Sequence, residues 1–234
     1  MIEAMCGLHD ELKEIRTDLR LAMNGVISSS MREKGVVYKL NFGVAYPEIK
    51  HIAAKHKPSS GLAEALWNED IREFKILASF LHPADEMSLD KALSWVADIP
   101  YMEIAEHCSR NLFSNLTCRE ELISTLLSSA TKETFSRIVG FLTAAEVCRR
   151  KEKPLEKTID LLLKQSVASL LLAEETSISE RFAAMQALKF YGRQSAESSG
   201  SVFKALDECR DSNVKPEELD EIYNELKFEF EYYL

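Results

Sequence analysis

The sequence contains little that would build a β-sheet or a membrane anchor. Only 8 glycines and 6 prolines occur in 234 residues, too few for the many tight turns of an all-β protein. No run of about 18 apolar residues is present, so no transmembrane helix is expected. The first residues, "MIEAMCGLHDELKE", turn acidic early and lack the charged-then-apolar pattern of an export signal. These absences favour a cytoplasmic protein.

Motifs of metal sites, nucleotide sites and nucleophilic hydrolases are also missing. There is no CxxC, no HExxH, no P-loop, no GxGxxG and no GxSxG, and we expect neither a metal nor a cofactor. The cysteines are odd in number and widely spaced, as expected of reduced thiols in a reducing compartment. They are Cys6, Cys108, Cys118, Cys148 and Cys209.

The negative charge is concentrated at one end of the chain. The net charge is −9, of which −6 lies in residues 203–234 and only −3 in the first 202 residues. Basic residues gather between Arg32 and Lys57 and again in "CRRKEKPLEK", residues 148–157. Local patches rather than net charge decide whether a phosphate backbone can bind, so these two clusters are compatible with a nucleic-acid partner.

Apolar residues repeat at helical spacing along almost the whole chain. Examples are Phe74, Leu77 and Leu81 in "IREFKILASFL". The helices form short pairs, whose second members are predicted to start near residues 70, 100, 132, 178 and 216. The sequence therefore predicts an all-α fold: a single-domain HEAT-like helical-hairpin solenoid over residues 1–234. We expect residues 1–45 to form an N-terminal helical cap and residues 203–234 to form acidic C-terminal helices.

The stretch "IPYMEIAEHCSRNLF", residues 99–113, contains two neighbouring glutamates, Glu103 and Glu106. On a helix at 100° per residue, Ile104, Ala105, Cys108 and Leu112 form the buried face. Glu103, Glu106, His107 and Arg110 are then expected on the opposite, solvated side. Two i,i+4 pairs, Glu103 with His107 and Glu106 with Arg110, would explain these residues without any chemistry.

Four stretches carry a family resemblance. They are "GVAYPEIKHIAAK" (43–55), "LAEALWNEDIREFKILASFL" (62–81), "WVADIPYMEIAEHCSRNLF" (95–113) and "RFAAMQALKFYGR" (181–193). In this order and spacing, across roughly residues 20–200, the chain resembles the HEAT-like-repeat DNA alkylation repair family of the AlkD type. The resemblance implies hydrolysis of the N-glycosidic bond of N3- or N7-alkylated purines in DNA. Such a base is cationic and a good leaving group, so one carboxylate and aromatic faces suffice in principle.

The resemblance also implies site residues. The family motif W-D-x-x-D aligns with residues 102–106, which places Glu106 at the catalytic carboxylate and Met102 at a tryptophan. Glu103 lies beside them in the motif, and Tyr101 is the nearest aromatic residue. The family arginine aligns with Arg137, with Ile138 as the alternative in a shift of one residue. The family's last tryptophan aligns with Gln186.

The chain departs from the family pattern at Met102, Glu106 and Gln186, which stand where the family has tryptophan, aspartate and tryptophan. Two alternatives to a glycosylase therefore stay open. A DNA-binding relative without the chemistry would tolerate the loss of both tryptophans and the longer glutamate. A helical-repeat scaffold for protein partners would need neither.

We expect the protein to be a monomer that binds damaged duplex DNA. We do not expect it to bind a membrane. Lys39, Arg149, Arg150, Lys151, Lys189 and Arg193 are the candidate phosphate contacts. The DNA interpretation further requires Glu106, Arg137 and the cluster from Arg149 to Lys153 to share one face. We also expect the acidic tail after Phe203 to weaken DNA binding by long-range repulsion, so deletion of residues 212–234 should tighten binding if the fold survives.

Overall fold

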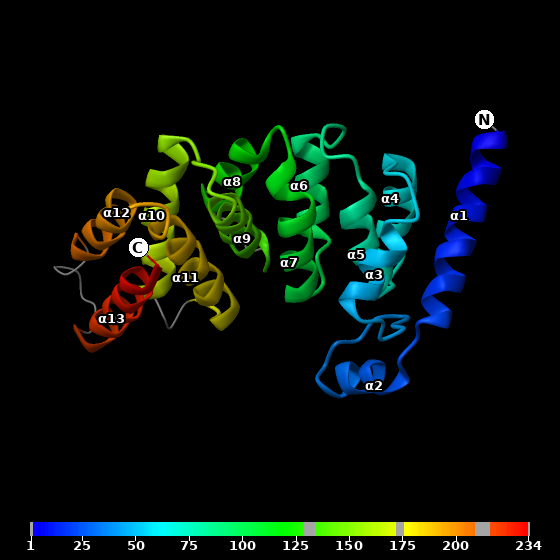
Figure 1. Ribbon diagram of the computed structural model, residues 1–234, viewed down its shortest axis with the longest axis horizontal. Coiled ribbons are helices and arrows are strands. Elements are labelled where there is room, and N and C mark those ends of the chain that lie inside the picture. Colours follow the sequence, from blue (N-terminus) through cyan, green and yellow to red (C-terminus); the bar gives the residue numbers. More distant parts are fainter. Residues whose placement is uncertain (1, 129–133, 172–175, 209–215, 234) are drawn as a thin grey trace. The chain divides into compact units, whose positions relative to one another are not determined.

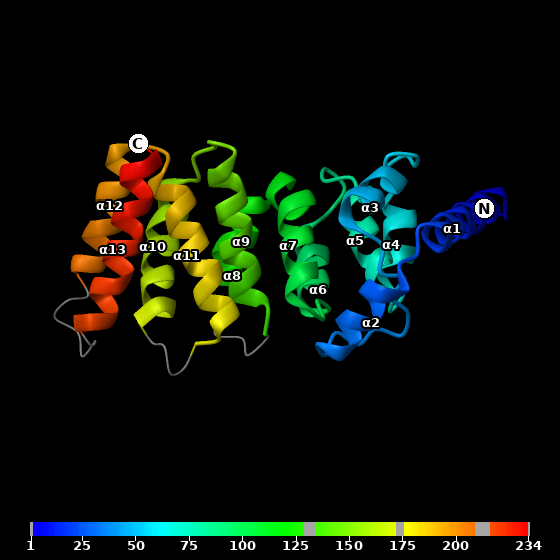
Figure 2. The ribbon, with the colours of Figure 1, turned by 60° about the horizontal axis from the view of Figure 1, so that its bottom comes forward.

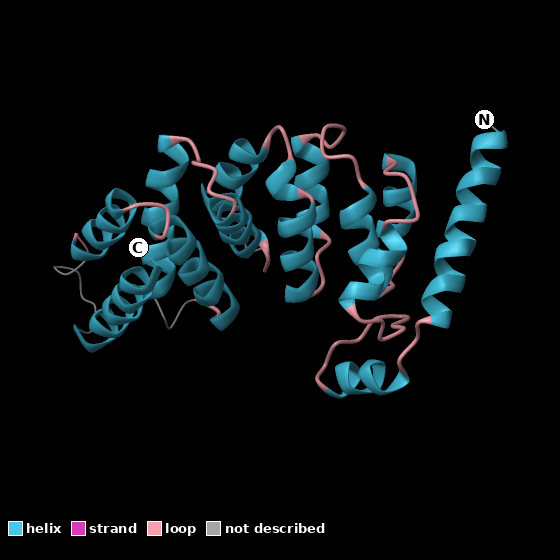
Figure 3. Ribbon diagram, viewed as in Figure 1, coloured by secondary structure: helices cyan, strands magenta, loops and turns pink. Residues whose placement is uncertain are grey.

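The computed structural model describes residues 2–128, 134–171, 176–208 and 216–233. The regular structure of these ranges consists of thirteen α-helices and one short 3-10 helix (Figure 3). They contain no strand, only an isolated bridge between Leu40 and Ile71. The predicted all-α class is confirmed. In these ranges no helix is long and apolar enough to cross a membrane.

The chain divides into two compact units, residues 1–88 and 89–234. The helices of the first unit are α1 (Ile2–Leu21), α2 (Gly25–Glu33), α3 (Tyr46–Ala53), α4 (Ser60–Trp67) and α5 (Arg72–Leu81) (Figure 1). Helix α5 contacts both α3 and α4, and α1 packs against α3 and α4. Phe74, Leu77 and Leu81 are buried in this unit, as their spacing predicts.

A buried ion pair fixes the loop before α3 to helix α5. Arg72 Nη1 lies 2.9 Å from Glu73 Oε1, and Arg72 also donates to the carbonyl of Val44 at 3.0 Å. The Glu73 carboxylate accepts the backbone N–H groups of Phe42 and Val44 at 3.1 and 3.2 Å. Because Glu73 is fully buried, these four bonds compensate the desolvation of both charges.

Lys75 is tied down in the same unit. Its Nζ donates to the carbonyl of Trp67 at 2.9 Å and lies 4.4 Å from the centre of the Trp67 ring. Arg72, Glu73 and Lys75 all belong to "LAEALWNEDIREFKILASFL" (62–81), one of the four stretches that carry the family resemblance. Their contacts show that this stretch stabilises the fold.

The second unit stacks helical hairpins in two layers. Its helices are α6 (Leu89–Ala97), α7 (Met102–Asn111), η1 (Phe113–Asn115), α8 (Arg119–Ser128), α9 (Ser136–Arg149), α10 (Glu156–Leu171), α11 (Ile178–Gly192), α12 (Ala196–Asp207) and α13 (Pro216–Tyr233). The first helices of successive hairpins (α6, α8, α10, α12) contact one another in order. The second helices (α7, α9, α11, α13) do the same (Figure 2). The layer of second helices carries most of the predicted site.

The predicted starts of the second helices agree with the structure to within a few residues. Residues 72, 102, 136, 178 and 216 open α5, α7, α9, α11 and α13. Ser177 caps α11, and its hydroxyl accepts the N–H of Glu180 at 3.1 Å. The capping pattern therefore fixes the start of the helix that carries Gln186.

The position of His107 differs from the prediction. Its side chain is buried rather than solvated. Helix α7 packs against both α9 and the following 3-10 helix, so its flank is covered as well as its apolar face. His107 Nε2 lies 3.9 Å from Glu103 Oε1, which confirms that pair, although on a partly buried flank.

Candidate functional site

A small cavity of about 180 Å³ lies among α7, α9 and α11. Glu106 and Arg110 reach it from α7, Glu146 from α9, and Gln186 from α11. On each helix the lining residues are three or four apart, so they share one face. The cavity therefore brings together Glu106 and Gln186, two of the site residues that the resemblance implies.

Two phenylalanines that the sequence analysis missed also line this cavity. Phe182 and Phe190 lie one turn before and one turn after Gln186 on α11. The side chain of Phe182 is half exposed, which is unusual for so large an apolar group. The i, i+4, i+8 spacing of the aromatic pair around Gln186 is the signal that would have found them. They supply aromatic faces where the family's tryptophans are absent.

The second carboxylate of the cavity, Glu146, is bound to arginines. Arg110 Nε donates to its Oε1 at 3.1 Å, and Arg149 Nε donates to its Oε2 at 2.8 Å. Only 12% of the Glu146 side chain is exposed. Glu146 is therefore a structural link that holds α7 and α9 together and fixes the two guanidinium groups.

Glu106 differs from Glu146. Within the described ranges its carboxylate takes part in no hydrogen bond or ion pair. Partial burial raises the pKa of Glu106, the Arg110 charge lowers it, and the Glu103 charge raises it again. An uncommitted, partly desolvated carboxylate beside aromatic rings can stabilise a positive charge that enters the cavity.

The start of α7 holds the other residues of the family motif. Tyr101 precedes the helix in an extended conformation, and Met102 is its first residue. Glu103 follows in the first turn and faces His107. None of these three residues is among those that line the cavity with Glu106.

Arg137 lies on α9 but outside the lining of the cavity. Its Nη1 is 3.5 Å from Glu180 Oε1, and Ser169 donates to the same oxygen at 2.7 Å. The Arg137 side chain is 39% exposed. The structure thus places Arg137 beside the start of α11, where Glu180 holds it, and does not bring it to Glu106.

The predicted phosphate contacts fall into separate places. Arg149 lies next to the cavity, because it donates a hydrogen bond to Glu146, which lines the cavity. Arg150 Nη1 donates to Asn115 Oδ1 at 2.5 Å, and Lys151 is exposed with a left-handed backbone (φ 61°). Lys39 belongs to the first unit, where its backbone N–H is bonded to Asp70.

Lys189 on α11 and Arg193, the residue directly after this helix, are both paired with carboxylates of α13. Lys189 Nζ lies 2.6 Å from Glu225 Oε1, and Arg193 forms an ion pair with Glu229. Of all the candidate contacts, these two are the most completely neutralised by neighbouring helices.

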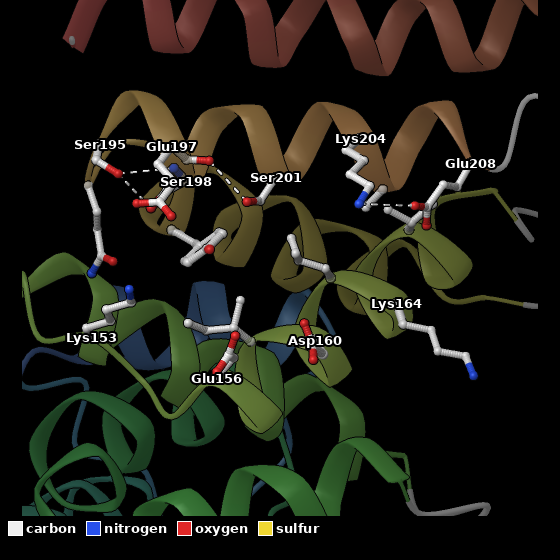
Figure 4. Close-up of a pocket in the computed structure, with 16 residues that line it drawn as sticks. Lys153, Glu156, Asp160, Lys164, Ser195, Glu197, Ser198, Ser201, Lys204 and Glu208 are labelled. Carbon is white, nitrogen blue, oxygen red and sulfur yellow. Dashed lines mark hydrogen bonds and ion pairs between the residues drawn. The ribbon is translucent and has the colours of Figure 1, made fainter.

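A second cavity of about 930 Å³ lies along α10 and α12 (Figure 4). Both lysines and carboxylates line it, and Lys204 lies 3.9 Å from Glu208. It contains none of the predicted site residues. It does contain Lys153, so the basic cluster from Arg149 to Lys153 is divided between two places. The single site that the DNA interpretation required for Glu106, Arg137 and this whole cluster is therefore not formed.

Within the described ranges, no group of three or more histidines, cysteines or acidic residues is arranged to hold a metal ion.

Comparisons with known proteins agree with the fold. One solved structure is described as "a new family of proteins related to the HEAT-like repeat DNA glycosylases with affinity for branched DNA structures". It matches with a TM-score of 0.72 at 15% sequence identity, and the match covers 92% of this chain and 94% of the other. This confirms the HEAT-like fold. No curated protein matches the sequence.

The sequence pattern of the family described as "DNA alkylation repair enzyme" matches residues 15–166, well over half of the chain. The match spans the buried Arg72–Glu73 pair, helix α7 with Glu106, and helix α9 with Arg137. The chain belongs to the DNA alkylation repair enzyme family.

Proposed function

We propose that this protein binds duplex DNA along α7, α9 and α11 and hydrolyses the N-glycosidic bond of an alkylated purine placed next to Glu106. The observation that carries the proposal is the state of Glu106. It is an uncommitted carboxylate in a cavity that it shares with Gln186 and two phenylalanine rings. The other carboxylate of the cavity, Glu146, is already neutralised by Arg110 and Arg149.

The chemistry requires little from the protein. An N3- or N7-alkylated purine carries a positive charge, and the bond from C1′ to its nitrogen breaks with the electron pair going to the base. The sugar becomes oxocarbenium-like, and a water adds to C1′ and loses a proton to solvent. The Glu106 carboxylate would stabilise the sugar cation electrostatically, and Phe182 and Phe190 would bind the cationic base.

The proposal is tested with purified protein and alkylated duplex DNA. Release of 7-methylguanine or 3-methyladenine above the spontaneous rate would support it. Binding to the same duplex should weaken steeply between about 50 and 200 mM salt, because phosphate contacts release counterions. Binding that ignores salt would contradict a phosphate-contact surface.

A second candidate is recognition of branched DNA without base release. The structural relative described by its affinity for branched DNA favours it, together with the absence of both family tryptophans from Met102 and Gln186. Competition between a four-way junction and a linear duplex of equal length would decide. A clear preference for the junction, with no base released from either, would favour this candidate.

We further propose that the protein acts as a monomer in a reducing compartment. Cys108, Cys118 and Cys148 are free thiols, and burial raises the pKa of Cys148 to about 12, so it stays protonated and unreactive. The side chain of Cys6 and the whole of Cys209 lie outside the described residues.

A further inference from the structure

The two basic side chains at the end of α11 are clamped by the acidic helix α13. Lys189 Nζ lies 2.6 Å from Glu225 Oε1 and 3.7 Å from Glu229 Oε2. Arg193 forms an ion pair with Glu229. Lys189 and Arg193 are four residues apart, and so are Glu225 and Glu229. The contacts therefore form a ladder between α11 and α13.

The ladder also covers its cations. Only 14% of the Lys189 side chain and 22% of the Arg193 side chain are exposed. The Arg193 guanidinium lies 4.0 Å from the ring centre of Tyr233 on α13 and 4.8 Å from that of Phe190. Phe190 in turn lines the cavity with Glu106. The covered cations are therefore adjacent to the proposed site.

We propose that Glu225 and Glu229 occupy, in the free protein, the positions that two backbone phosphates of DNA take in the complex. The inference rests on the proposed function, because it names how access to that same DNA surface is limited. A carboxylate and a phosphate present the same acceptor oxygens to a lysine or an arginine. DNA must therefore exchange its phosphates for the two glutamates before α11 can bind it.

The exchange involves side chains and leaves the helix in place. The apolar face of α13 is buried, with Leu226 at 0% and Phe230 at 4% exposure. The Phe230 ring packs so closely on Gly192 of α11 that even a methyl group there would overlap it. Deleting the acidic tail would uncover this face, so a deletion cannot separate lost repulsion from lost packing. Point substitutions can.

The helix provides its own matched control. Asp220 and Glu221 lie on α13, are exposed, and form no ion pair among the residues that the structure describes. Replacing them removes the same charge as replacing Glu225 and Glu229. Long-range repulsion predicts equal effects of the two double substitutions. Direct competition predicts that only the replacement of Glu225 and Glu229 changes DNA binding.

The experiment measures binding of a fluorescein-labelled linear duplex to the full chain by anisotropy. The proteins are wild type, Glu225→Gln with Glu229→Gln, and Asp220→Asn with Glu221→Gln. At about 100 mM salt we expect the first double variant to bind on the order of tenfold more tightly than wild type. Its log–log salt slope should stay close to that of wild type, because both complexes contain the same two phosphate contacts. The control variant should change affinity by less than about threefold. The single variant Glu225→Gln alters a half-exposed residue, so it should leave the protein folded. It should still give part of the effect.

Equal tightening by both double variants would overturn the inference in favour of general repulsion. Binding by wild type that neither variant improves would also overturn it, while the proposed function would stand. Binding seen only after Glu225 and Glu229 are replaced would support it most strongly. If no protein binds DNA at any salt concentration, the inference falls together with the proposed function.

Discussion

The Nε atom of Arg110 lies 3.1 Å from Oε1 of Glu146, and this ion pair joins α7 to α9 at the edge of the Glu106 cavity. The same arginine lowers the pKa of Glu106, against the larger rise caused by burial. The ionisation of the candidate catalytic carboxylate therefore depends on a guanidinium that a different carboxylate holds in place.

Replacing Arg110 by glutamine should raise the pKa of Glu106 further, because it removes the positive charge that lowers this pKa. Base release requires the ionised form, so the acidic limb of its pH profile should move to higher pH. Carboxyl NMR titration and pH–rate profiles would both measure the shift. Arg149→Gln is the matched control, since it removes the other arginine of Glu146. An equal shift in both variants, or none in Arg110→Gln, would contradict this electrostatic role.

Glu106 should reduce stability at neutral pH. Its folded-state pKa is raised, so folding favours the protonated form, and stability falls as pH rises through the folded pKa. Glu106→Gln should therefore raise the melting temperature at pH 7 by about 1–3 °C. The gain should vanish near pH 4, where the carboxyl in the folded protein is largely protonated. A variant less stable than wild type at pH 7 would indicate a structural role for Glu106.

The aromatic lining should contribute to binding of a cationic base. Phe182→Leu keeps the apolar volume but removes the ring, and should lower base release roughly tenfold with little loss of stability. Phe228→Leu, on the exposed side of α13, provides the control. If the two substitutions have the same effect, Phe182 does not bind the base.

The buried ion pair of the first unit should be essential for stability. Glu73→Gln removes the charge opposite Arg72. It also places an amide N–H₂ group against two backbone N–H groups, which in the wild type donate to the Glu73 carboxylate. We expect a loss of roughly 3 kcal/mol or more in the free energy of unfolding, measured by urea denaturation. The exposed Glu69→Gln should stay within about 0.5 kcal/mol of wild type. A small loss for Glu73→Gln would mean that the network can rearrange.

The sequence was sufficient for features set by local periodicity. The apolar repeat predicted the helical pairs and the start of α11 near residue 178, because it does not depend on distant residues. Features that depend on tertiary contacts could not be predicted from the local sequence. The burial of His107 depends on how α9 and η1 cover α7.

The candidate site shows the same limit. Glu106 and Gln186, which the family resemblance implies as site residues, both line one cavity. It could not show that Glu225 and Glu229 neutralise Lys189 and Arg193, because these contacts join helices separated by α12. Nor could it place the aromatic faces, since the phenylalanines occupy positions other than those of the family's tryptophans.

The most direct test of the whole account is the rate of base release from alkylated duplex DNA by wild type and three variants. We expect Glu106→Gln to lose a factor of about 10²–10³, the usual effect of removing one electrostatic group from an active site. Glu103→Gln, which changes the glutamate that pairs with His107, should stay within about twofold of wild type. Glu106→Asp restores the family's residue and should raise the rate if the extra methylene displaces the carboxylate. Equal release by wild type and Glu106→Gln would contradict the assignment of the carboxylate, and no release by wild type would leave DNA binding without the chemistry.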